Sequence, residues 1–497
     1  MKPMERVVIL GGGSAGWMAA AMLARMLGPS LVITLVESEQ IGTVGVGEAA
    51  IPPLQLFNQA LGLSEAEFMS ATAASIKLGI QFEGWGGAGE RYMHAFGQVG
   101  KDLGLTPFHH YWLQAGEETE RFWDYSLNEQ AARAGRVLLP SPPQGKMLGG
   151  LVHAYHFDAH RYAQTLRRYS ERLGVRRVAG EVVRVPLCPD SGQIQALELA
   201  DGQRIEGELF IDCSGFAGRL IEQALGSGFE DWGHWLPCDR AWAVPCEGAE
   251  SIAPYTRSIA REAGWQWQIP LQHRIGNGLV FSSRFQDEQS AKESLLANLP
   301  GKPLAEPKLL RFRTGRRRQP WLRNCVALGL ASGFLEPLES TSIHLVQSGI
   351  MRLLKLFPNH GPMDSLAAEY NRQSQREFEQ VRDFLILHYH LNRRDEPLWQ
   401  HCRSMSLPDS LSHKLVLFAE QGRVLRDSDE LFTEVAWVQV MLGQGLRPQQ
   451  AHPLAAALSP AERRDYLGHL RTIVMGTLQG MPSHRAFLQR YCPQAKE

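Results

Sequence analysis

The sequence contains few cysteines, and they are scattered along the chain. Its seven cysteines never form a C-x-x-C pair. This distribution argues against a zinc site and a disulfide framework, and it fits a reducing cytoplasm. We therefore expect no bound metal. The cysteines are Cys188, Cys213, Cys238, Cys246, Cys325, Cys402 and Cys492.

The sequence also lacks long apolar runs and an excess of one charge. No apolar segment reaches the roughly 20 residues that a membrane-spanning helix needs, and glycines interrupt the N-terminal apolar run before it could form a signal-peptide core. The formal net charge is −1, and we interpret the basic run Arg316-Arg317-Arg318 as a solvated turn. Neither nucleic acid nor an anionic membrane is indicated as a partner, so we expect a soluble cytoplasmic protein.

The N-terminus has the order strand, glycine turn, helix. Val7-Val8-Ile9-Leu10 reads as a short buried strand, a GxGxxG turn follows, and an alanine-rich helical run continues to about Met26. In such a turn the glycines permit a tight bend, close approach to a pyrophosphate and close helix–strand packing, while the helix N-terminus attracts the anion. The candidate pyrophosphate-binding residues are Gly11, Gly13, Ser14, Ala15 and Gly16.

A second apolar strand makes this interpretation more specific. The run 31–36 ends at Glu37, 21 residues after Gly16. An acidic residue at that spacing can accept hydrogen bonds from a ribose hydroxyl. GxGxxG alone is weak evidence in a chain with 48 glycines, and Glu37 alone could be a strand-end charge. Their order and spacing together predict a nucleotide-binding α/β fold.

Two segments beyond Glu37 contain candidate site residues. Residues 41–53 hold three glycines and read as a loop close to a ligand, with a plain flexible loop as the alternative. Residues 75–83 alternate as one strand, and on periodicity alone Lys77 is a solvent-facing lysine. In the next strand, the rings of Tyr92, His94 and Phe96 share one face, as in ordinary packing.

Three later motifs lie at the end of a predicted strand, within a predicted strand and at the start of a predicted helix. Asp212-x-Ser214-Gly215 ends an apolar strand, as in flavin domains where the chain returns to the nucleotide. Trp265-Gln266-Trp267-Gln268-Ile269-Pro270 has period two and, without context, is an aromatic core strand. Residues 340–342 are good N-cap residues for a helix over 343–357 that could bind an anion, although an ordinary capped helix is commoner.

The C-terminal part reads as mostly helical. The expected helices cover 365–391, 408–421, 433–442 and 460–479. No internal repeat or low-complexity segment is evident.

With these motifs assembled, the sequence resembles the flavin-dependent tryptophan halogenases over nearly its whole length. The generic motif is GxGxxG, and the specific one is WxWxIP at 265–270 together with Lys77 in its strand. The loop Gly45-Val46-Gly47-Glu48-Ala49 and the run 336–341 (EPLEST) complete the set. The resemblance extends to the motif at 437–445.

The resemblance implies two-component flavin chemistry. FADH₂ from a separate NAD(P)H-flavin reductase reacts with O₂ to give a flavin hydroperoxide, which oxidises chloride or bromide to hypohalous acid. Trp265 and Trp267 match the tryptophans that lie between flavin and substrate and prevent direct oxygen transfer. Lys77 matches the lysine that directs the oxidant, either as an ammonium donating a hydrogen bond or as a haloamine.

The resemblance also assigns the other site residues. Glu339 matches the active-site glutamate that stabilises or deprotonates the arenium intermediate. Thr341 and Ser342 fall at the halide site; the family often has glycine at the position of Ser342, which leaves the halide preference open. Further flavin-binding positions are Gly47, Glu48, Ala49, Leu330 and Ile343.

The substrate end matches the family only in part. His94 and Phe96 match aromatic residues that sandwich an indole. Tryptophan-specific members add a tyrosine pair and a Phe-Trp pair, whereas this chain has only Glu430-Leu431-Phe432 and a lone Trp437. We therefore expect an indole-type arene, with indole or a related compound at least as favoured as tryptophan.

The fold implied is α/β: a Rossmann-like FAD-binding domain of the GR2 monooxygenase type, with a mixed-sheet substrate module and a helical C-terminal region. We expect the first two to interleave over residues 1–360 and the helical region to cover 361–497. Many members are homodimers. Two other readings stay open, a flavoprotein monooxygenase that hydroxylates an aromatic substrate and a non-catalytic FAD-binding protein.

Overall fold

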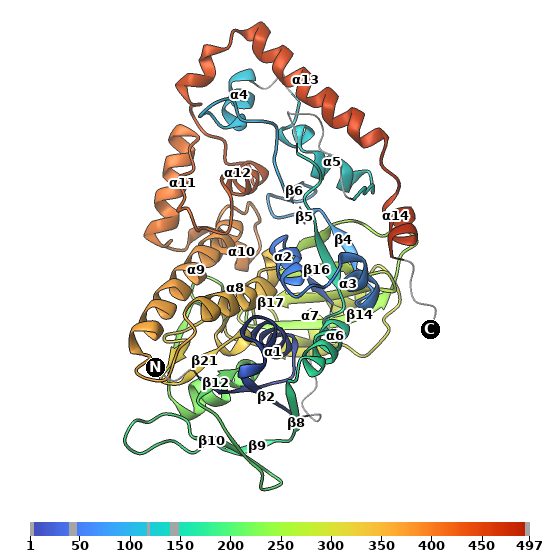
Figure 1. The fold of residues 1–497 in the computed structure, drawn as a ribbon. Helices are drawn as coiled ribbons and strands as arrows, with labels where there is room; N and C mark the ends of the chain where they lie inside the picture. Colours follow the sequence, from blue (N-terminus) through green and yellow to red (C-terminus); the bar gives the residue numbers. More distant parts are fainter. Residues whose placement is uncertain (1–3, 39–46, 117–119, 140–148, 493–497) are drawn as a thin grey trace. The chain divides into compact units, whose positions relative to one another are not determined.

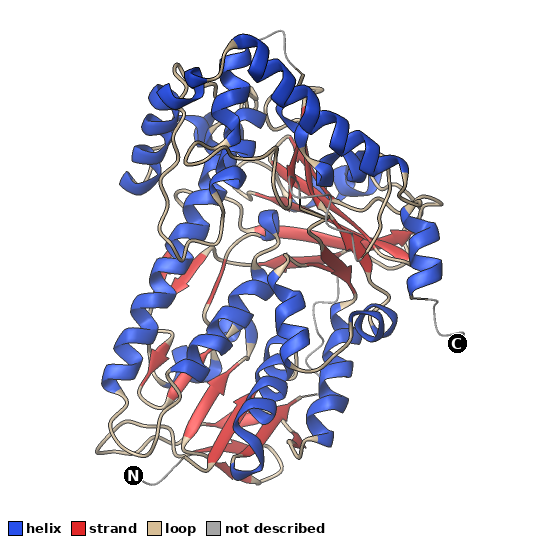
Figure 2. Ribbon diagram, turned by 45° about the horizontal axis from the view of Figure 1, so that its top comes forward, coloured by secondary structure: helices blue, strands red, loops and turns tan. Residues whose placement is uncertain are grey.

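A computed structural model describes residues 4–38, 47–116, 120–139 and 149–492 (Figures 1 and 2). The chain divides into two compact units. Unit 1 comprises residues 1–72, 157–234 and 311–379, and unit 2 comprises residues 73–156, 235–310 and 380–497. Because each unit is built from three separate stretches, the chain passes repeatedly from one to the other. The predicted boundary near residue 360 stays a prediction.

Unit 1 is built on a six-stranded sheet with the order β20-β21-β12-β1-β2-β8. The five strands from β21 to β8 are parallel, and β20 is antiparallel to its neighbour. Val7, Val8 and Ile9 of β1 are almost fully buried, as expected for a central parallel strand covered on both faces. The strands are β1 (Arg6–Leu10), β2 (Val32–Glu37), β8 (Arg176–Ala179), β12 (Leu209–Asp212), β20 (Trp321–Leu322) and β21 (Cys325–Ala327).

Helix α1 (Ser14–Leu27) packs against β1, β2 and two further helices, α6 (Ala159–Arg172) and α8 (Ser342–Lys355) (Figure 1). Its alanines 19–21 are fully buried, and such small side chains let neighbouring backbones approach closely. The predicted nucleotide-binding α/β fold is confirmed. Shorter elements complete the unit: β3 (Glu48–Ala49), α2 (Pro53–Ala60), α3 (Glu65–Ala71), β9 (Val182–Arg184), β10 (Ala196–Leu199), β11 (Arg204–Glu206), β13 (Phe229–Asp231), β19 (Gly315–Arg317) and β22 (Gly333–Phe334).

The prediction that Arg316-Arg317-Arg318 is a solvated turn was wrong. Arg316 and Arg317 lie in strand β19 and are buried. Arg316 Nη2 lies 2.7 Å from a carboxylate oxygen of Glu230, and Arg317 Nη1 lies 2.7 Å from one of Glu222. Both partners come from distant segments, so the local sequence gave no sign of the pairs that allow these charges to be buried.

Unit 2 is built on a seven-stranded mixed sheet with the order β18-β14-β17-β16-β15-β5-β6. Strands β5 and β15 are parallel, whereas β5–β6, β15–β16, β16–β17 and β14–β17 are antiparallel. The strands are β5 (Gly79–Glu83), β6 (Arg91–Ala95), β14 (Arg240–Glu247), β15 (Thr256–Arg261), β16 (Gly264–Pro270), β17 (Arg274–Phe281) and β18 (Lys308–Arg311).

The predicted helices of the C-terminal part are confirmed to within a residue or two. They are α9 (Asp364–His390), which begins in unit 1, α11 (Asp409–Gln421), α12 (Glu434–Gly443) and α13 (Pro460–Gln479). The sequence reading missed the short α10 (Pro397–Ser404) and α14 (His484–Tyr491). Unit 2 also contains α4 (Phe108–Ala115), α5 (Leu127–Arg133) and α7 (Glu288–Ala297). Across the described parts of the chain, no helix is long and apolar enough to span a membrane.

The single alternating strand predicted over 75–83 is two strands. Residues Ser75–Lys77 form β4, which pairs antiparallel with residues 154–156 of β7 (Ala154–Phe157), and the chain resumes as β5 at Gly79. Between them the N–H of Leu78 donates to the carbonyl oxygen of Pro254 at 2.7 Å. The side chains that alternation assigned to solvent, including Lys77, are buried, because both faces are covered.

Candidate active site

In unit 1, the glycine turn has the close approaches that its sequence predicts. Gly11 has φ 117°, and a Cβ there would lie 2.3 Å from the carbonyl oxygen of Cys213. A Cβ at Gly16 would lie 1.9 Å from the carbonyl oxygen of Gly11. Gly13, the N-cap of α1, has no side chain to cap the helix, and a Cβ there would meet no neighbouring atom of the described residues within 4 Å. Ser14 and Ala15 begin the helix.

Glu37 lies at the end of β2 and pairs with two arginines. Its Oε1 contacts Arg177 of the neighbouring strand β8 and lies 3.7 Å from Arg167 Nη1 of α6. Its Oε2 lies against Gly12, where a Cβ would approach it to 1.5 Å. The sequence reading missed both arginines, because the pairing of β2 with β8 brings Arg177 to Glu37 and the packing of helix α6 brings Arg167.

The loop after Glu37 lies partly outside the described residues, including Gly45 and Val46. Gly47 has φ 80°, and Glu48 and Ala49 form the short strand β3. Burial raises the pKa of Glu48 to about 7. This predicted flavin loop therefore contains a carboxyl group whose pKa is raised by burial.

Asp212 ends β12 and supports the turn that follows it. Its Oδ1 accepts hydrogen bonds from the N–H and hydroxyl of Ser214, and its Oδ2 accepts from the N–H groups of Leu220 and Ile221, each at 2.8 Å. The carboxylate of the Asp-x-Ser-Gly motif therefore binds backbone and hydroxyl groups of its own loop.

The second candidate anion site begins at a short 3₁₀ turn, 337–339, that contains the buried Glu339. Ser340 follows with φ 59°, and Thr341 is the N-cap of α8. The predicted side-chain cap is absent, because the buried Thr341 Oγ1 has no hydrogen-bond partner among the described residues. Ser342 and Ile343 form the first turn of α8, with Ile343 buried, while Leu330 lies half-buried in the turn 329–331.

In unit 2, Lys77 is 0% exposed, so the solvent-facing interpretation was wrong. Its Nζ lies 5.3 Å from the centre of the Phe96 ring, a distance typical of a cation–π contact. Phe96 follows β6, which contains His94, and both side chains are buried. The structure thus brings together two of the predicted residues, Lys77 and Phe96, because the paired strands β5 and β6 lie between them in the chain.

Two buried histidines hydrogen-bond to the residues before Lys77. Nδ1 of His156 lies 3.1 Å from the hydroxyl of Ser75, and its Nε2 lies 2.9 Å from the hydroxyl of Thr256. The N–H of Ile76 donates to Nε2 of His484 at 3.1 Å. Burial lowers the pKa of His484 to about 4, and burial together with the charge of Lys77 lowers the pKa of His156 well below its usual value.

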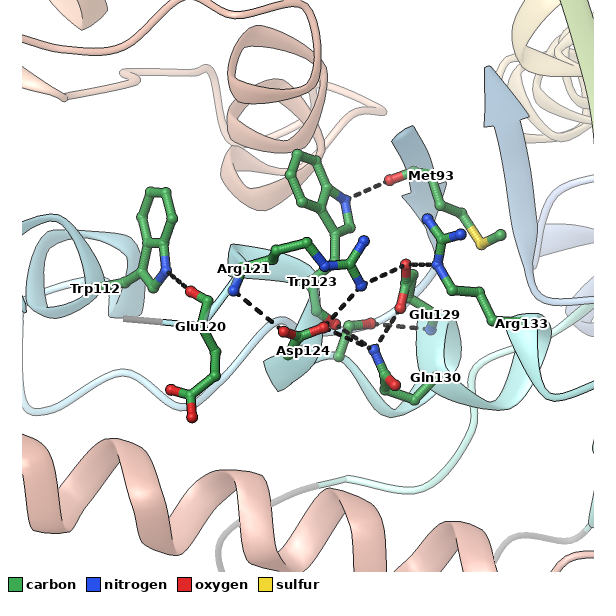
Figure 3. A network of polar contacts seen from close by, with 10 residues as sticks. Met93, Trp112, Glu120, Arg121, Trp123, Asp124, Glu129, Gln130 and Arg133 are labelled. Carbon is green, nitrogen blue, oxygen red and sulfur yellow. Dashed lines mark hydrogen bonds and ion pairs between the residues drawn. The ribbon is translucent and has the colours of Figure 1, made fainter. Parts of the chain in front are cut away.

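Helix α5 contacts the other side of the Lys77 segment. The amide nitrogen of Asn128 donates to the carbonyl oxygen of Leu78 at 3.1 Å. A polar network beside it includes the buried carboxylate of Glu129, which contacts Arg133, and an Arg121–Asp124 pair at 2.8 Å (Figure 3). Trp123 Nε1 in the same network donates to the carbonyl oxygen of Met93 in β6. The network thus connects α5 to the strand that contains His94.

The two tryptophans of WxWxIP lie in the fully buried strand β16. The rings of Trp265 and Trp267 are 6.1 Å apart, and Trp265 also contacts Trp85 at 6.5 Å. A Cβ at Gly278 would lie 2.0 Å from the Trp267 ring, so the neighbouring strand passes beneath it without a side chain. The indole Nε1–H of Trp267 is buried and has no acceptor in the described part of the chain.

An aromatic cluster adjoins His94. Phe384 stacks on Phe432 with ring centres 3.7 Å apart, and it meets His94 at 5.6 Å and the edge of Trp437 at 4.8 Å. Trp437 Nε1 donates to Oε1 of the buried Glu430 at 2.8 Å.

The second oxygen of Glu430 lies 3.1 Å from Nζ of Lys414. Lys414 Nζ also lies 5.2 Å from the centre of the Trp437 ring. The carboxylate near the cluster is therefore engaged by a cation and an indole N–H. Within the described ranges, no group of histidine, cysteine or acidic residues could hold a metal ion.

Comparison with known proteins decides the family. The sequence profile of the tryptophan halogenases matches residues 6–460. The chain belongs to the tryptophan halogenase family. It is thus a flavin-dependent oxidoreductase. The family and the fold class that the resemblance implied are confirmed.

Relatives in this halogenase family align over nearly the whole chain. The tryptophan 6-halogenase SttH of Streptomyces toxytricini is 36% identical, over 96% of this chain and 97% of its own. The structure of the flavin-dependent halogenase Xcc4156 of Xanthomonas campestris is 50% identical, with a TM-score of 0.96 and full coverage of both chains. That of BrvH from Brevundimonas sp. BAL3 is 45% identical, with a TM-score of 0.95 and 99% coverage of both.

Membership of this family implies that the cofactor is FAD. The residues around the glycine turn fit an FAD molecule. The surroundings of Gly13, the close approaches at Gly11 and Gly16, and the carboxylate of Glu37 are compatible with a bound nucleotide. The sequence reading found these residues because they lie within two short motifs. It missed His156, His484, Asn128 and Lys414, whose contacts join distant segments.

Proposed function

We propose that this chain catalyses the FADH₂- and O₂-dependent chlorination or bromination of an indole-type arene. The observation that carries the proposal is the buried amine of Lys77 next to an aromatic ring. A lysine sealed inside a protein without a functional role is unusual, because burying an ammonium is costly. The tryptophan halogenases named above are its relatives, and the reaction type extends from them to this chain.

The cofactor residues divide into those for FAD and those for halide. The N–H groups at the start of α1, at Ser14 and Ala15, would bind the pyrophosphate, and Oε2 of Glu37 would accept from the ribose. Gly47, Glu48, Ala49, Leu330 and Ile343 would lie against the flavin. Bound FADH₂ supplies, with O₂, the oxidant that converts halide to hypohalous acid.

The halide would bind at the N-terminus of α8. The hydroxyl of Thr341, which has no partner among the described residues, can donate to an anion, and the positive end of a 14-residue helix favours one. The side chain of Ser342 would border the same position. Its size would set the preference between chloride and bromide.

Lys77 would direct the oxidant. Its contact with the face of the Phe96 ring favours the ammonium form, which donates a hydrogen bond to hypohalous acid and makes the halogen more electrophilic. The packed rings of Trp265 and Trp267 would separate the flavin from the arene, so that oxygen is not transferred directly. Glu339, buried and acidic, would stabilise the arenium cation or remove its proton.

The substrate ring would lie between His94 and Phe96, with Trp437 behind the aromatic cluster. The carboxylate of Glu430 is engaged by Lys414 and Trp437, so it offers no open anchor for an ammonium group. We therefore infer that the arene is indole or an uncharged indolic compound in preference to free tryptophan. A separate NAD(P)H-flavin reductase would supply FADH₂, and the protein would act as a homodimer in the cytoplasm.

A mass-spectrometric assay tests the proposal. The protein is incubated with FAD, NADH, a flavin reductase and O₂, with chloride and bromide supplied separately to tryptophan, indole and larger indoles. We expect a halogen isotope pattern, and a loss of about a thousandfold in Lys77→Ala because the amine activates the oxidant. Lys308→Ala, at an exposed position, is the matched control. An oxygenated product that needs no halide would overturn the proposal in favour of a monooxygenase.

A further inference from the structure

Strand β4, which contains Lys77, has only three residues, and a strand this short makes few ladder hydrogen bonds. On one side it pairs with β7. Its remaining contacts come from side chains and loops distant in sequence. The position of the Lys77 backbone therefore depends on the groups that bind residues 75, 76 and 78.

The partner of Ile76 is the residue farthest away in the sequence. Its N–H donates to Nε2 of His484, 408 residues later, at 3.1 Å. On the opposite side of the ring, Nδ1 of His484 lies 2.9 Å from the carbonyl oxygen of Ile252. Because a carbonyl oxygen only accepts, Nδ1 carries the proton and Nε2 is the acceptor. The imidazole is thus neutral, and each nitrogen has one defined partner.

His484 is itself held in place by its surroundings. It is 1% exposed and is the first residue of α14. Its own N–H donates to the carbonyl oxygen of Gly135 at 2.8 Å, and the hydroxyl of Ser483 caps the helix by accepting from the N–H of Ala486. Phe487 and Leu488 bury the inner face of the helix. The ring is therefore a rigid contact between α14 and β4.

We propose that His484 is a positioning residue for Lys77: helix α14 fixes, through this imidazole, the backbone of the strand that presents the amine. The inference rests on the proposed function for the role of Lys77, and it adds a residue from the last helix of the described chain. An amine moved by about 1 Å from the reacting atom can lose about a hundredfold in rate. His484 acts on the reaction without touching it.

The test compares His484→Leu, which removes both hydrogen bonds, with His484→Gln, whose amide can donate and accept. His469→Leu, at an exposed position in α13, is the matched control. The first readout is the ratio of halogenated product to hydrogen peroxide. We expect it to fall about tenfold or more in His484→Leu and to stay within about threefold in His484→Gln. FAD affinity and the rate of FADH₂ oxidation, which depend on unit 1, should not change.

The second readout needs no catalysis. Hydrogen exchange of the peptide over residues 74–80, measured by mass spectrometry, should accelerate about tenfold or more in His484→Leu, because the Ile76 amide loses its acceptor. If the leucine variant does not fold, His484→Asn, whose shorter amide cannot span both contacts, replaces it with the same expectation.

The outcomes separate this inference from the proposed function. An unchanged product-to-peroxide ratio and unchanged exchange in His484→Leu would overturn the positioning role, even if the wild-type protein halogenates. A different result would overturn the proposed function instead: the wild-type protein halogenates no arene, while His484→Leu still exchanges faster over residues 74–80. The faster exchange would then support the contact between His484 and Ile76.

Discussion

The candidate site residues of unit 1 and of unit 2 are assembled in different ways. In unit 1 the candidate residues come from short, continuous motifs: Gly11 to Gly16 form one turn, and Glu339 to Ile343 form another. In unit 2 the surroundings of Lys77 come from residues 128, 156, 254 and 484. A nucleotide has a fixed shape that one turn can match, whereas a buried lysine must be enclosed from every side.

The two units also differ in the charges of the side chains that form their buried contacts. In unit 1, Glu377 of α9 pairs with Arg352 and His344 of α8, and these partners lower the pKa of Glu377 to about 2. In unit 2, side chains that hydrogen-bond to residues 75, 76 and 78 include two neutral imidazoles and an amide. Neutral neighbours add no second positive charge beside Lys77. The described histidine and asparagine side chains that hold residues 75, 76 and 78 are thus uncharged.

We expect the largest effect of any substitution in unit 1, on the affinity for FAD. Gly16→Ala would set a Cβ 1.9 Å from the carbonyl oxygen of Gly11 and force the turn open. We expect FAD affinity, measured by fluorescence titration, to fall about a hundredfold because the helix N-terminus and the turn no longer fit the pyrophosphate.

Gly468→Ala, a helical position where a Cβ meets nothing within 4 Å, is the control. Hydrogen exchange at residues 74–80 should stay unchanged in both variants. A Gly16→Ala protein with wild-type FAD affinity would show that the turn is not the nucleotide site.

The second prediction concerns the pH dependence of stability, where we expect a smaller effect than for Gly16→Ala. Two buried groups, His484 and Glu48, should change the stability in opposite directions as the pH falls. The pKa of His484 is lowered to about 4, so the unfolded chain binds a proton near pH 6.5 that the folded chain refuses. Stability therefore falls as the pH drops from 6.5 toward 4, by about 2 kcal/mol at pH 5 for this group. Glu48, with a pKa raised to about 7, acts in the opposite direction, because the folded chain takes up its proton first.

Urea unfolding at pH 7 and pH 5 measures this slope. His109 and His110 in α4 and His156 add to the loss, since burial lowers the pKa of each, and Glu434, with a pKa raised to about 7, offsets part of it. His484→Gln should reduce the loss between pH 7 and pH 5 by about 2 kcal/mol. An equal reduction in His469→Gln, at an exposed position, would contradict the assignment.

The smallest effect concerns substrate choice in unit 2. Lys414→Met leaves the buried carboxylate of Glu430 without its cation, and an ammonium group on the substrate could then compensate it. We expect the kcat/KM ratio of tryptamine to indole to rise about tenfold, as one partly buried charge pair allows. The double variant Lys414→Met/Glu430→Gln should restore the original ratio, and a ratio that moves equally in both would refute the role of the carboxylate.

The sequence predicted most of unit 1 because its information is local. The GxGxxG turn, Glu37 at its strand end and the helix start after Glu339 lie within short windows whose periodicity and spacing have known structural meanings. Even in unit 1, the sequence reading was wrong where the environment of a residue depends on tertiary structure. Arg316 and Arg317 are buried by Glu230 and Glu222, and Thr341 begins its helix without capping it.

In unit 2 the sequence located the residues but not their surroundings. Alternation placed Lys77 on a polar, solvent-facing side, because period two cannot distinguish a covered polar face from an exposed one. His484 and Lys414 carried no recognisable pattern, since their contacts depend on tertiary packing. The resemblance to the family singled out Lys77, and its role stays a prediction, whereas only the structure identified the histidines that bind the residues before it.

The contact between Ile76 and His484 also has a consequence for biosynthesis. Synthesis proceeds from the N-terminus, so the glycine turn and β1 leave the ribosome long before the last helix exists. The strand with Lys77 lacks its acceptor at Ile76 until residue 484 has been made. The candidate nucleotide-binding turn has therefore been synthesised long before the backbone next to Lys77 can gain this contact.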